Sequence, residues 1–470
     1  MGCWAIWELM IPINRGGKLK ILFYQKEIKV IWLLFLSLMV FTYTNYKISS
    51  CDIFNPSVIF SAMFLLFSFF CCLANFFIGI DIEEIVTIAV ILLGIGIFTF
   101  FNYVLGRRYE FKKMVVKKCE ITSLWGVIGI IVLILDIYIE YNYIMTFSAA
   151  YGLASDFFEA MVQYKIITTL KDADAILVPS PWYRGFFITI GSCFAYFSIY
   201  VFFQKKICND KFSIIYGSVI LLYSIFSLMG GGRSETFRVV TACIFIWYFF
   251  YRIHKGEHFN IRPVFLKFIF LLSAVSLFFI SFTYIVGRSQ ADMDFEAVAM
   301  SMFIYAGAPI FNLDIYLQNP WEQTYGIFGE LTFIRLINWL GIKFGESSLV
   351  YELDLPFLSY RNYDLGNVYT TFYAFIYDFG FLGVVFLTGF MAIACVWLYN
   401  KVNYVAIMSN RISLYVICYA YLLNDIVMLP FSNRFYESLA NIGFLYRLIV
   451  LFVLVKIFNF SIRRKHFHLF

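Results

Sequence analysis

The feature that most constrains this chain is a series of continuous apolar runs, each about as long as a lipid bilayer is thick. An α-helix of about 20 apolar residues crosses the hydrocarbon core and satisfies its own backbone hydrogen bonds, as lipid requires. Such runs lie at 28–46, 57–79, 84–104, 121–141, 186–203, 212–229, 237–252, 264–286, 380–399, 408–429 and 440–460. The sequence therefore predicts an all-α polytopic membrane protein with about 11 transmembrane helices.

The composition leaves too little polar surface for a soluble protein of 470 residues. Charged residues make up 14% of the chain and hydrophobic residues 62%, whereas about 25% of an ordinary soluble domain is charged. Lipid must therefore solvate much of the surface. No internal repeat or linker divides the chain, so we predict a single membrane-embedded domain over 1–470.

Clusters of lysine and arginine in the short loops predict the orientation of the spans, because basic residues are retained on the cytoplasmic side. They mark 105–120, 205–211, 252–267 and Lys401 as cytoplasmic, and 463–465 places the C-terminus there as well. The formal net charge of +6 belongs to these loops and does not indicate a nucleic-acid partner.

The N-terminus does not fit this alternation. Counting the spans backwards places it outside, yet five basic residues between Arg15 and Lys29 favour the inside. Three explanations remain open: the stretch from Trp4 to Ile13 dips into the membrane, the first span is unusual, or translation starts further downstream.

Two long segments remain on the extracytoplasmic side, 142–185 and 287–379. Long loops usually serve a purpose. In 332–341 the apolar residues fall on one helical stripe, which predicts a helix lying on the membrane surface, and 149–167 has a similar pattern. We expect both segments to cap the bundle.

One motif joins two predicted spans at the outer surface, GGGRSETFR at 230–238. Three glycines permit a sharp turn and leave backbone N–H groups open. Arg233 and Arg238 could hold a phosphate there, because a guanidinium presents a two-pronged donor to an oxyanion. The alternative is a tight turn whose arginines extend to lipid headgroups. Five further arginines are expected on this side of the membrane: Arg184, Arg288, Arg335, Arg361 and Arg434.

A second motif, GNVYTTFYAFIYDFGFLG at 366–383, leads from the longer loop into a span. Asp378 would lie at the outer mouth of the bundle, where an acid is costly unless paired and is a functional candidate. The alternative is a carboxylate that caps the following helix.

The chemistry available outside is limited by residue type. All four histidines fall on the inside, so a general base outside must be a carboxylate, namely Glu235, Asp314, Glu330, Asp364 or Asp378. Asp-x-Asp pairs at 172–174 and 292–294 could bind a divalent metal, but such pairs also arise by chance in acidic loops. We predict no metal site and no cofactor.

The two motifs, in this order, together with the loop layout, resemble the polysaccharide repeat-unit polymerases, the Wzy-type O-antigen and capsule polymerases. The likeness covers most of the chain from about residue 50. It implies a helical bundle resembling the GT-C-like membrane glycosyltransferases and O-antigen ligases. It also implies an enzyme of the bacterial plasma (inner) membrane that joins undecaprenyl-pyrophosphate-linked oligosaccharide units. A chain-length regulator and a flippase are candidate partners.

The resemblance also implies roles for individual residues. Arginines would stabilise the negative charge that develops when a sugar–pyrophosphate bond breaks. Arg233 would be catalytic, and Asp378 would accept a proton from the acceptor hydroxyl or orient it. The remaining candidates would bind substrate: Arg238, Arg288, Arg361, Arg434 and Tyr369, the last by stacking on a sugar ring.

Two alternatives stay open. An O-antigen ligase or another lipid-linked glycan transferase would use the same charges with a different acceptor, although ligases usually keep a histidine in the large outside loop and this loop has none. A transporter or flippase would require charged or broken helices near mid-membrane, but the spans have few central charges, of which Asp136 is one, and a flippase would not need so long an outside loop.

Overall fold

The computed structural model describes residues 5–10, 22–27, 30–107, 121–152, 156–170, 178–211, 213–256, 295–360, 363–408 and 411–467. In this part of the chain, eight helices are long and apolar enough to cross a membrane, and two shorter apolar helices accompany them. The long ones are α1 (Val30–Ile48), α2 (Pro56–Ile78), α3 (Ile85–Leu105), α4 (Ser123–Ala150), α6 (Trp182–Ile207), α8 (Ser234–Lys255), α12 (Thr371–Met408) and α15 (Ile442–Phe467). The shorter ones are α7 (Ser213–Met229) and α13 (Leu414–Val427).

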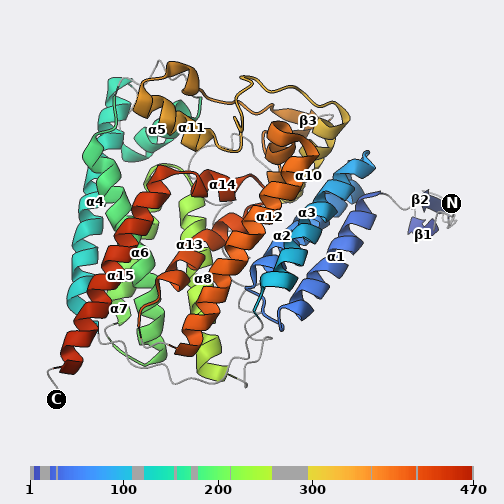
Figure 1. Cartoon of the computed structure of the whole chain (residues 1–470). Coiled ribbons are helices and arrows are strands. Elements are labelled where there is room, and N and C mark those ends of the chain that lie inside the picture. Colours follow the sequence, from blue (N-terminus) through green and yellow to red (C-terminus); the bar gives the residue numbers. More distant parts are fainter. Residues whose placement is uncertain are drawn as a thin grey trace.

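These helices coincide with ten of the predicted runs, which confirms a helical, multi-pass membrane protein (Figure 1). The remaining run, 264–286, lies outside the described residues. Figure 1 shows α5 (Phe157–Leu170) and α11 (Ile334–Phe344) at one end of the bundle and the C-terminus at the other. We call the first the outer end and the second the inner end, following the orientation predicted from the basic loops.

Small residues set the spacing between several helices, as expected where lipid removes the hydrophobic drive for association. A Cβ added to Gly94 of α3 would lie 2.2 Å from the ring of Phe372 on α12, so only glycine allows this approach. Gly129 of α4 lies in the same way against Phe194 of α6 and Val219 of α7.

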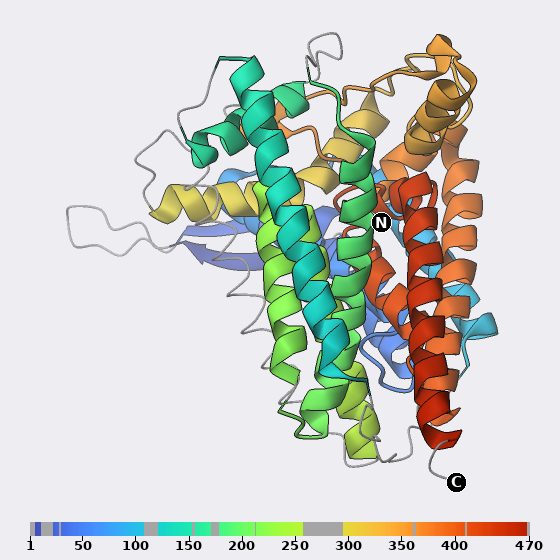
Figure 2. The same cartoon turned by 90° about the vertical axis from the view of Figure 1, so that its left-hand side faces the viewer.

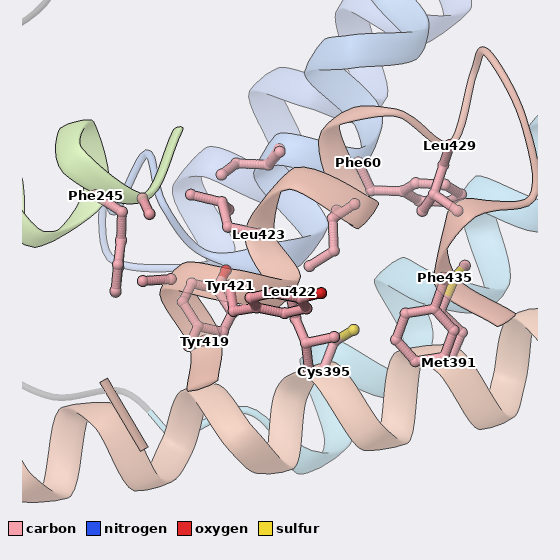
Figure 3. Packing of buried hydrophobic residues seen from close by; sticks show 14 of the residues in the cluster. Phe60, Phe245, Met391, Cys395, Tyr419, Tyr421, Leu422, Leu423, Leu429 and Phe435 are labelled. Atoms are coloured by element: carbon pink, nitrogen blue, oxygen red, sulfur yellow. The ribbon is translucent and has the colours of Figure 1, made fainter. Parts of the chain in front are cut away.

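Helix α13 occupies the centre of the bundle. Every residue from Val416 to Ile426 is buried, so α13 contacts protein rather than lipid on all sides. Figure 3 shows Tyr419, Tyr421, Leu422 and Leu423 of α13 packed among side chains of neighbouring elements, including Cys395 of α12.

The long outer segment is not only a cap, which corrects one expectation. Its first helix, α10 (Phe295–Gln318), packs against α2 and α3, and Phe303 stacks on Phe70 and Phe77 of α2. Figure 2 shows the first turns of α10 (yellow) well below the outermost loops. Because it buries Ala308, Ile310, Phe311 and Leu313, α10 belongs to the bundle core.

The other predicted outer helices are present. α11 covers the stripe predicted in 332–341, and α5 covers most of 149–167, whose first residues extend α4 instead. The predicted boundary of the long loop at residue 379 is wrong, because α12 begins at Thr371 and is kinked at Gly380. The remaining outer elements are η3 (Ser347–Leu349), β3 (Leu358–Tyr360), β4 (Tyr363–Gly366) and α14 (Arg434–Leu439).

Two antiparallel hairpins were not predicted. β3 pairs with β4 in the outer segment. Near the N-terminus, β1 (Ala5–Met10) pairs with β2 (Leu22–Glu27), so the apolar stretch from Trp4 to Ile13, for which entry into the membrane was one of three explanations, contains a strand.

Candidate anion-binding site

The candidate site lies where α13 ends inside the bundle. Its 14 residues span about 21 Å, less than the hydrocarbon core of about 30 Å. The chain then turns and forms the short helix α14 before α15 begins. The backbone N–H of Thr371 at the start of α12 donates to the carbonyl of Leu429 at 2.9 Å, which fixes this turn. A helix can stop within the bundle only where protein surrounds the backbone that follows it. The end of α13 therefore leaves room for polar side chains inside the bundle.

Arg238 is the first cation of the site. It lies in the second turn of α8, below the glycine turn, and its side chain is only 12% exposed. Its Nη2 lies 2.8 Å from Oδ1 of the fully buried Asp425, near the end of α13. Its Nη1 lies 3.5 Å from Glu235 and donates to the hydroxyl of Tyr421. A buried arginine needs partners of this kind. The contacts of Arg238 with Asp425 and Tyr421 therefore hold α8 against α13 at this depth.

Arg447 is the second cation, and the sequence analysis missed it. It lies in the second turn of α15, and its Nη1 donates to the hydroxyl of Tyr421 at 2.7 Å. Both guanidinium groups lie over the Tyr421 ring, at 4.4 Å for Arg238 and 5.8 Å for Arg447. An arginine inside an apolar run was the signal that could have found it.

Glu235 completes the cluster from the first turn of α8. Tyr196 of α6 and Tyr223 of α7 donate their hydroxyls to its Oε1, at 3.2 Å and 3.0 Å. Both rings are buried, which gives the carboxylate a fixed position. Its side chain is 28% exposed, so it is the more accessible of the two carboxylates beside Arg238.

The cluster leaves hydrogen-bond donors open. Within the described residues, Nε of Arg238 and Nε of Arg447 are buried and have no partner. Arg447 also forms no ion pair with any carboxylate in this part of the chain. Buried polar groups are normally satisfied, and a charge within a membrane is costly without a counter-ion. The arrangement is therefore suited to an oxyanion.

Two more predicted arginines flank this cluster. Arg233 is the N-cap residue of α8, at the end of the glycine turn. Arg434 begins α14, pairs with Glu437 at 3.1 Å, and lies close enough to Asp425 to stabilise its charge. The structure therefore brings Arg233, Arg238 and Arg434 to one end of the bundle. Arg288 and Arg361 lie outside the described residues.

Asp378 lies in a different group. Both of its carboxylate oxygens accept backbone N–H groups, from Leu331 at 3.2 Å and Thr332 at 2.6 Å. It does not cap its own helix, because α12 begins seven residues earlier. None of the described contacts of its side chain involves an arginine. The geometry is that of an anchor holding the outer loop on α12.

Glu330 anchors the same loop. It accepts the Tyr377 hydroxyl at 2.6 Å and backbone N–H groups of Thr324, Tyr325 and Ile327. Burial favours its neutral form, but these hydrogen bonds to the charged form outweigh burial and lower the pKa of Glu330.

Tyr369 is packed rather than presented to a ligand. It is 2% exposed, its ring stacks on Tyr373 at 4.2 Å, and its hydroxyl donates to the carbonyl of Pro356. Its ring has no exposed face on which a sugar could stack in this conformation.

Arg184 is likewise held by a partner. Its Nε and Nη2 form a two-pronged pair with Glu140 of α4, each at 2.7 Å, and it lies 4.2 Å above the Tyr143 ring. This pair joins α4 to α6. Because Glu140 neutralises its charge, Arg184 is not grouped with Arg238 and Arg447, whose Nε donors are open.

The described residues contain no group of three or more histidine, cysteine or acidic side chains that could hold a metal ion. The Asp-x-Asp pairs at 172–174 and 292–294 lie outside them. No family model, no curated protein and no solved structure matches this chain.

Proposed function

We propose that the protein is a membrane glycosyltransferase of the bacterial plasma membrane that polymerises undecaprenyl-pyrophosphate-linked oligosaccharide repeat units into a surface polysaccharide. The observation that carries the proposal is Arg447, which lies beside Arg238 within the bundle, forms no salt bridge among the described residues and keeps a buried Nε without a hydrogen-bond partner. A lipid-linked pyrophosphate is an anion that reaches this depth at the outer leaflet. The resemblance of the two motifs to repeat-unit polymerases supports the same substrate class.

The reaction assigns a task to each group. A hydroxyl of the incoming unit attacks the anomeric carbon of the growing glycan, and the bond from that carbon to the pyrophosphate oxygen breaks. Arg238 and Arg447 would stabilise the charge on the leaving pyrophosphate. The hydroxyl proton needs a carboxylate, and Glu235 lies next to Arg238 and is partly exposed. Glu235 is therefore a better-placed base than Asp378, because none of the described contacts of the Asp378 side chain involves an arginine.

The decisive experiment compares Arg447→Gln with Arg335→Gln, an exposed arginine on α11 that serves as the matched control. We expect Arg447→Gln to lower polymer formation about 10²–10³-fold, the usual effect of losing one charge-stabilising donor. Arg335→Gln should form polymer normally. The measurement is the ladder of repeat units made from the lipid-linked oligosaccharide by purified protein. A normal ladder from a correctly inserted Arg447→Gln protein would refute the proposal, and Arg233→Ala tests the predicted catalytic arginine in the same assay.

A flippase for lipid-linked glycans is the second candidate function. It is favoured by the interrupted α13, the kink of α12 at Gly380 and the buried carboxyl of Asp136, features that transporters use. The product distinguishes the candidates. A polymerase makes a ladder from one substrate, a ligase transfers glycan to a different acceptor, and a flippase moves the substrate between leaflets unchanged.

A further inference from the structure

A cavity of about 640 Å³ opens at the inner end of the bundle, between the start of α13 and the middle turns of α15. It lies at the same end as the C-terminus, opposite the arginine cluster (Figure 1). Ten described residues line it: Arg411, Ile412, Ser413, Leu414, Tyr415, Phe452, Val455, Lys456, Asn459 and Phe460.

The frame of this cavity is held by hydrogen bonds. The side chain of Asn459 accepts the backbone N–H of Ile412 and donates to its carbonyl, each at 3.1 Å. The Ser413 hydroxyl accepts the N–H of Val416, which caps α13. These contacts fix the start of α13 against α15, so the cavity exists before any ligand enters.

The lining combines positive charge with apolar surface. Arg411 and Lys456 are exposed, and none of the ten lining residues is acidic. Lys456 lies 5.2 Å above the Phe452 ring. Phe452 is 50% exposed, Phe460 58% and Tyr415 38%, so the cavity is open to the lipid side of the helices. This lining complements a ligand with an anionic head and an apolar chain.

We propose that this cavity binds one anionic phospholipid of the cytoplasmic leaflet. The phosphate would lie between Arg411 and Lys456, where each basic side chain contributes attraction to an anionic lipid. An acyl chain would lie along Phe452 and Phe460, which line the cavity and are at least half exposed. The site is independent of the proposed reaction, because it lies at the opposite face and shares no residue with the arginine cluster.

The test measures lipid binding to the purified full-length protein by native mass spectrometry. Phosphatidylglycerol and phosphatidylcholine of identical chains are titrated against the wild type and three variants. Arg411→Gln/Lys456→Gln removes the charges, Arg411→Lys/Lys456→Arg keeps them, and Lys206→Gln is the matched control. Lys206 also lies at the inner end over an aromatic ring, that of Phe202, but it does not line this cavity.

We expect the wild type, the charge-keeping variant and Lys206→Gln to retain one phosphatidylglycerol that phosphatidylcholine does not replace. The double glutamine variant should bind it roughly 25-fold more weakly, since each of the two basic residues near the surface is worth about a factor of five. Inorganic phosphate at millimolar concentration should not displace the lipid, because it lacks the apolar chain. Equal binding of the two lipids, unchanged binding by the double glutamine variant, or displacement by phosphate would overturn the proposal.

Discussion

At Gly191 the backbone of α6 lies directly against the carboxyl group of Asp136 on α4. A Cβ added at Gly191 would lie 1.8 Å from Oδ2 of Asp136. Asp136 is 2% exposed and both of its oxygens lack hydrogen-bond partners among the described residues, so it is enclosed on all sides. The predicted central charge is therefore a point of close helix contact.

We expect Gly191→Ala to destabilise the protein by about 1–3 kcal/mol, because overpacking forces the two helices apart. Gly185→Ala on the same helix is the control, since its Cβ would meet nothing within 4 Å. Thermal unfolding of the purified protein is the measurement. Removing the clashing carboxyl in Asp136→Ala/Gly191→Ala should restore most of the loss, and a single mutant as stable as Gly185→Ala would contradict this account.

The lowered pKa of Glu330 predicts that the stability of the folded protein depends on pH. Its pKa is lowered in the folded state, so its contribution to stability is present above the unfolded pKa of about 4.3 and is lost as the pH falls through the folded value. Glu330→Gln should lower the melting temperature at pH 7 and flatten its decline in acid. Glu322→Gln, an exposed acid in the same loop, should do neither. Parallel pH profiles for wild type and Glu330→Gln would show that the carboxylate does not anchor the loop.

At the scale of elements, the kinked shape of the long helix α12 depends on one residue, Gly380. Gly380 has φ +63° and ψ −163°, a conformation that only glycine adopts readily. The outer turns carry Asp378, hold the loop and place Phe372 against Gly94 of α3. The inner turns place Gly389 against Phe101 of α3, so the kink lets one helix follow α3 while its outer end holds the loop.

Gly380→Ala should cost about 1–3 kcal/mol in stability through backbone strain, without any steric clash of the new methyl group. Gly96→Ala in the middle of α3 is the control, because its Cβ is also unobstructed but its backbone is helical. The readout is thermal unfolding, with protease sensitivity of the outer loop as a second measurement. Equal melting temperatures for the two variants would mean that α12 straightens without penalty.

At the scale of the whole molecule, the two ends of the bundle differ in their chemistry. The outer end holds Arg238 and Arg447 with Asp425 and Glu235, beneath α14 and the outer loops. The inner end holds a second, closed network, in which Asp52 pairs with Arg252 at 2.7 Å and accepts the hydroxyls of Tyr248 and Tyr399. The inner network ties α8, α12 and the α1–α2 turn together, whereas the outer one retains open donors.

Orientation is tested by cysteine labelling in a background without native cysteines. Gly230→Cys in the glycine turn should react with a membrane-impermeant maleimide in intact cells. Lys211→Cys, in the exposed turn between α6 and α7, should react only after permeabilisation. The opposite pattern would place the arginine cluster towards the cytosol and remove the proposed catalytic face.

The sequence by itself determined the class of fold and the positions of ten apolar helices, because a bilayer demands long apolar runs whatever their neighbours are. It also identified Arg233, Arg238 and Arg434 as candidate catalytic or substrate-binding residues. Only the tertiary structure decided that Arg447 joins Arg238 at Tyr421, that Asp378 accepts backbone N–H groups of the outer loop, and that Tyr369 is buried. The physical reason is that the role of a polar side chain depends on the groups that it contacts in the folded protein. These lie on helices far apart in the chain, and no local pattern of residues records which helices meet.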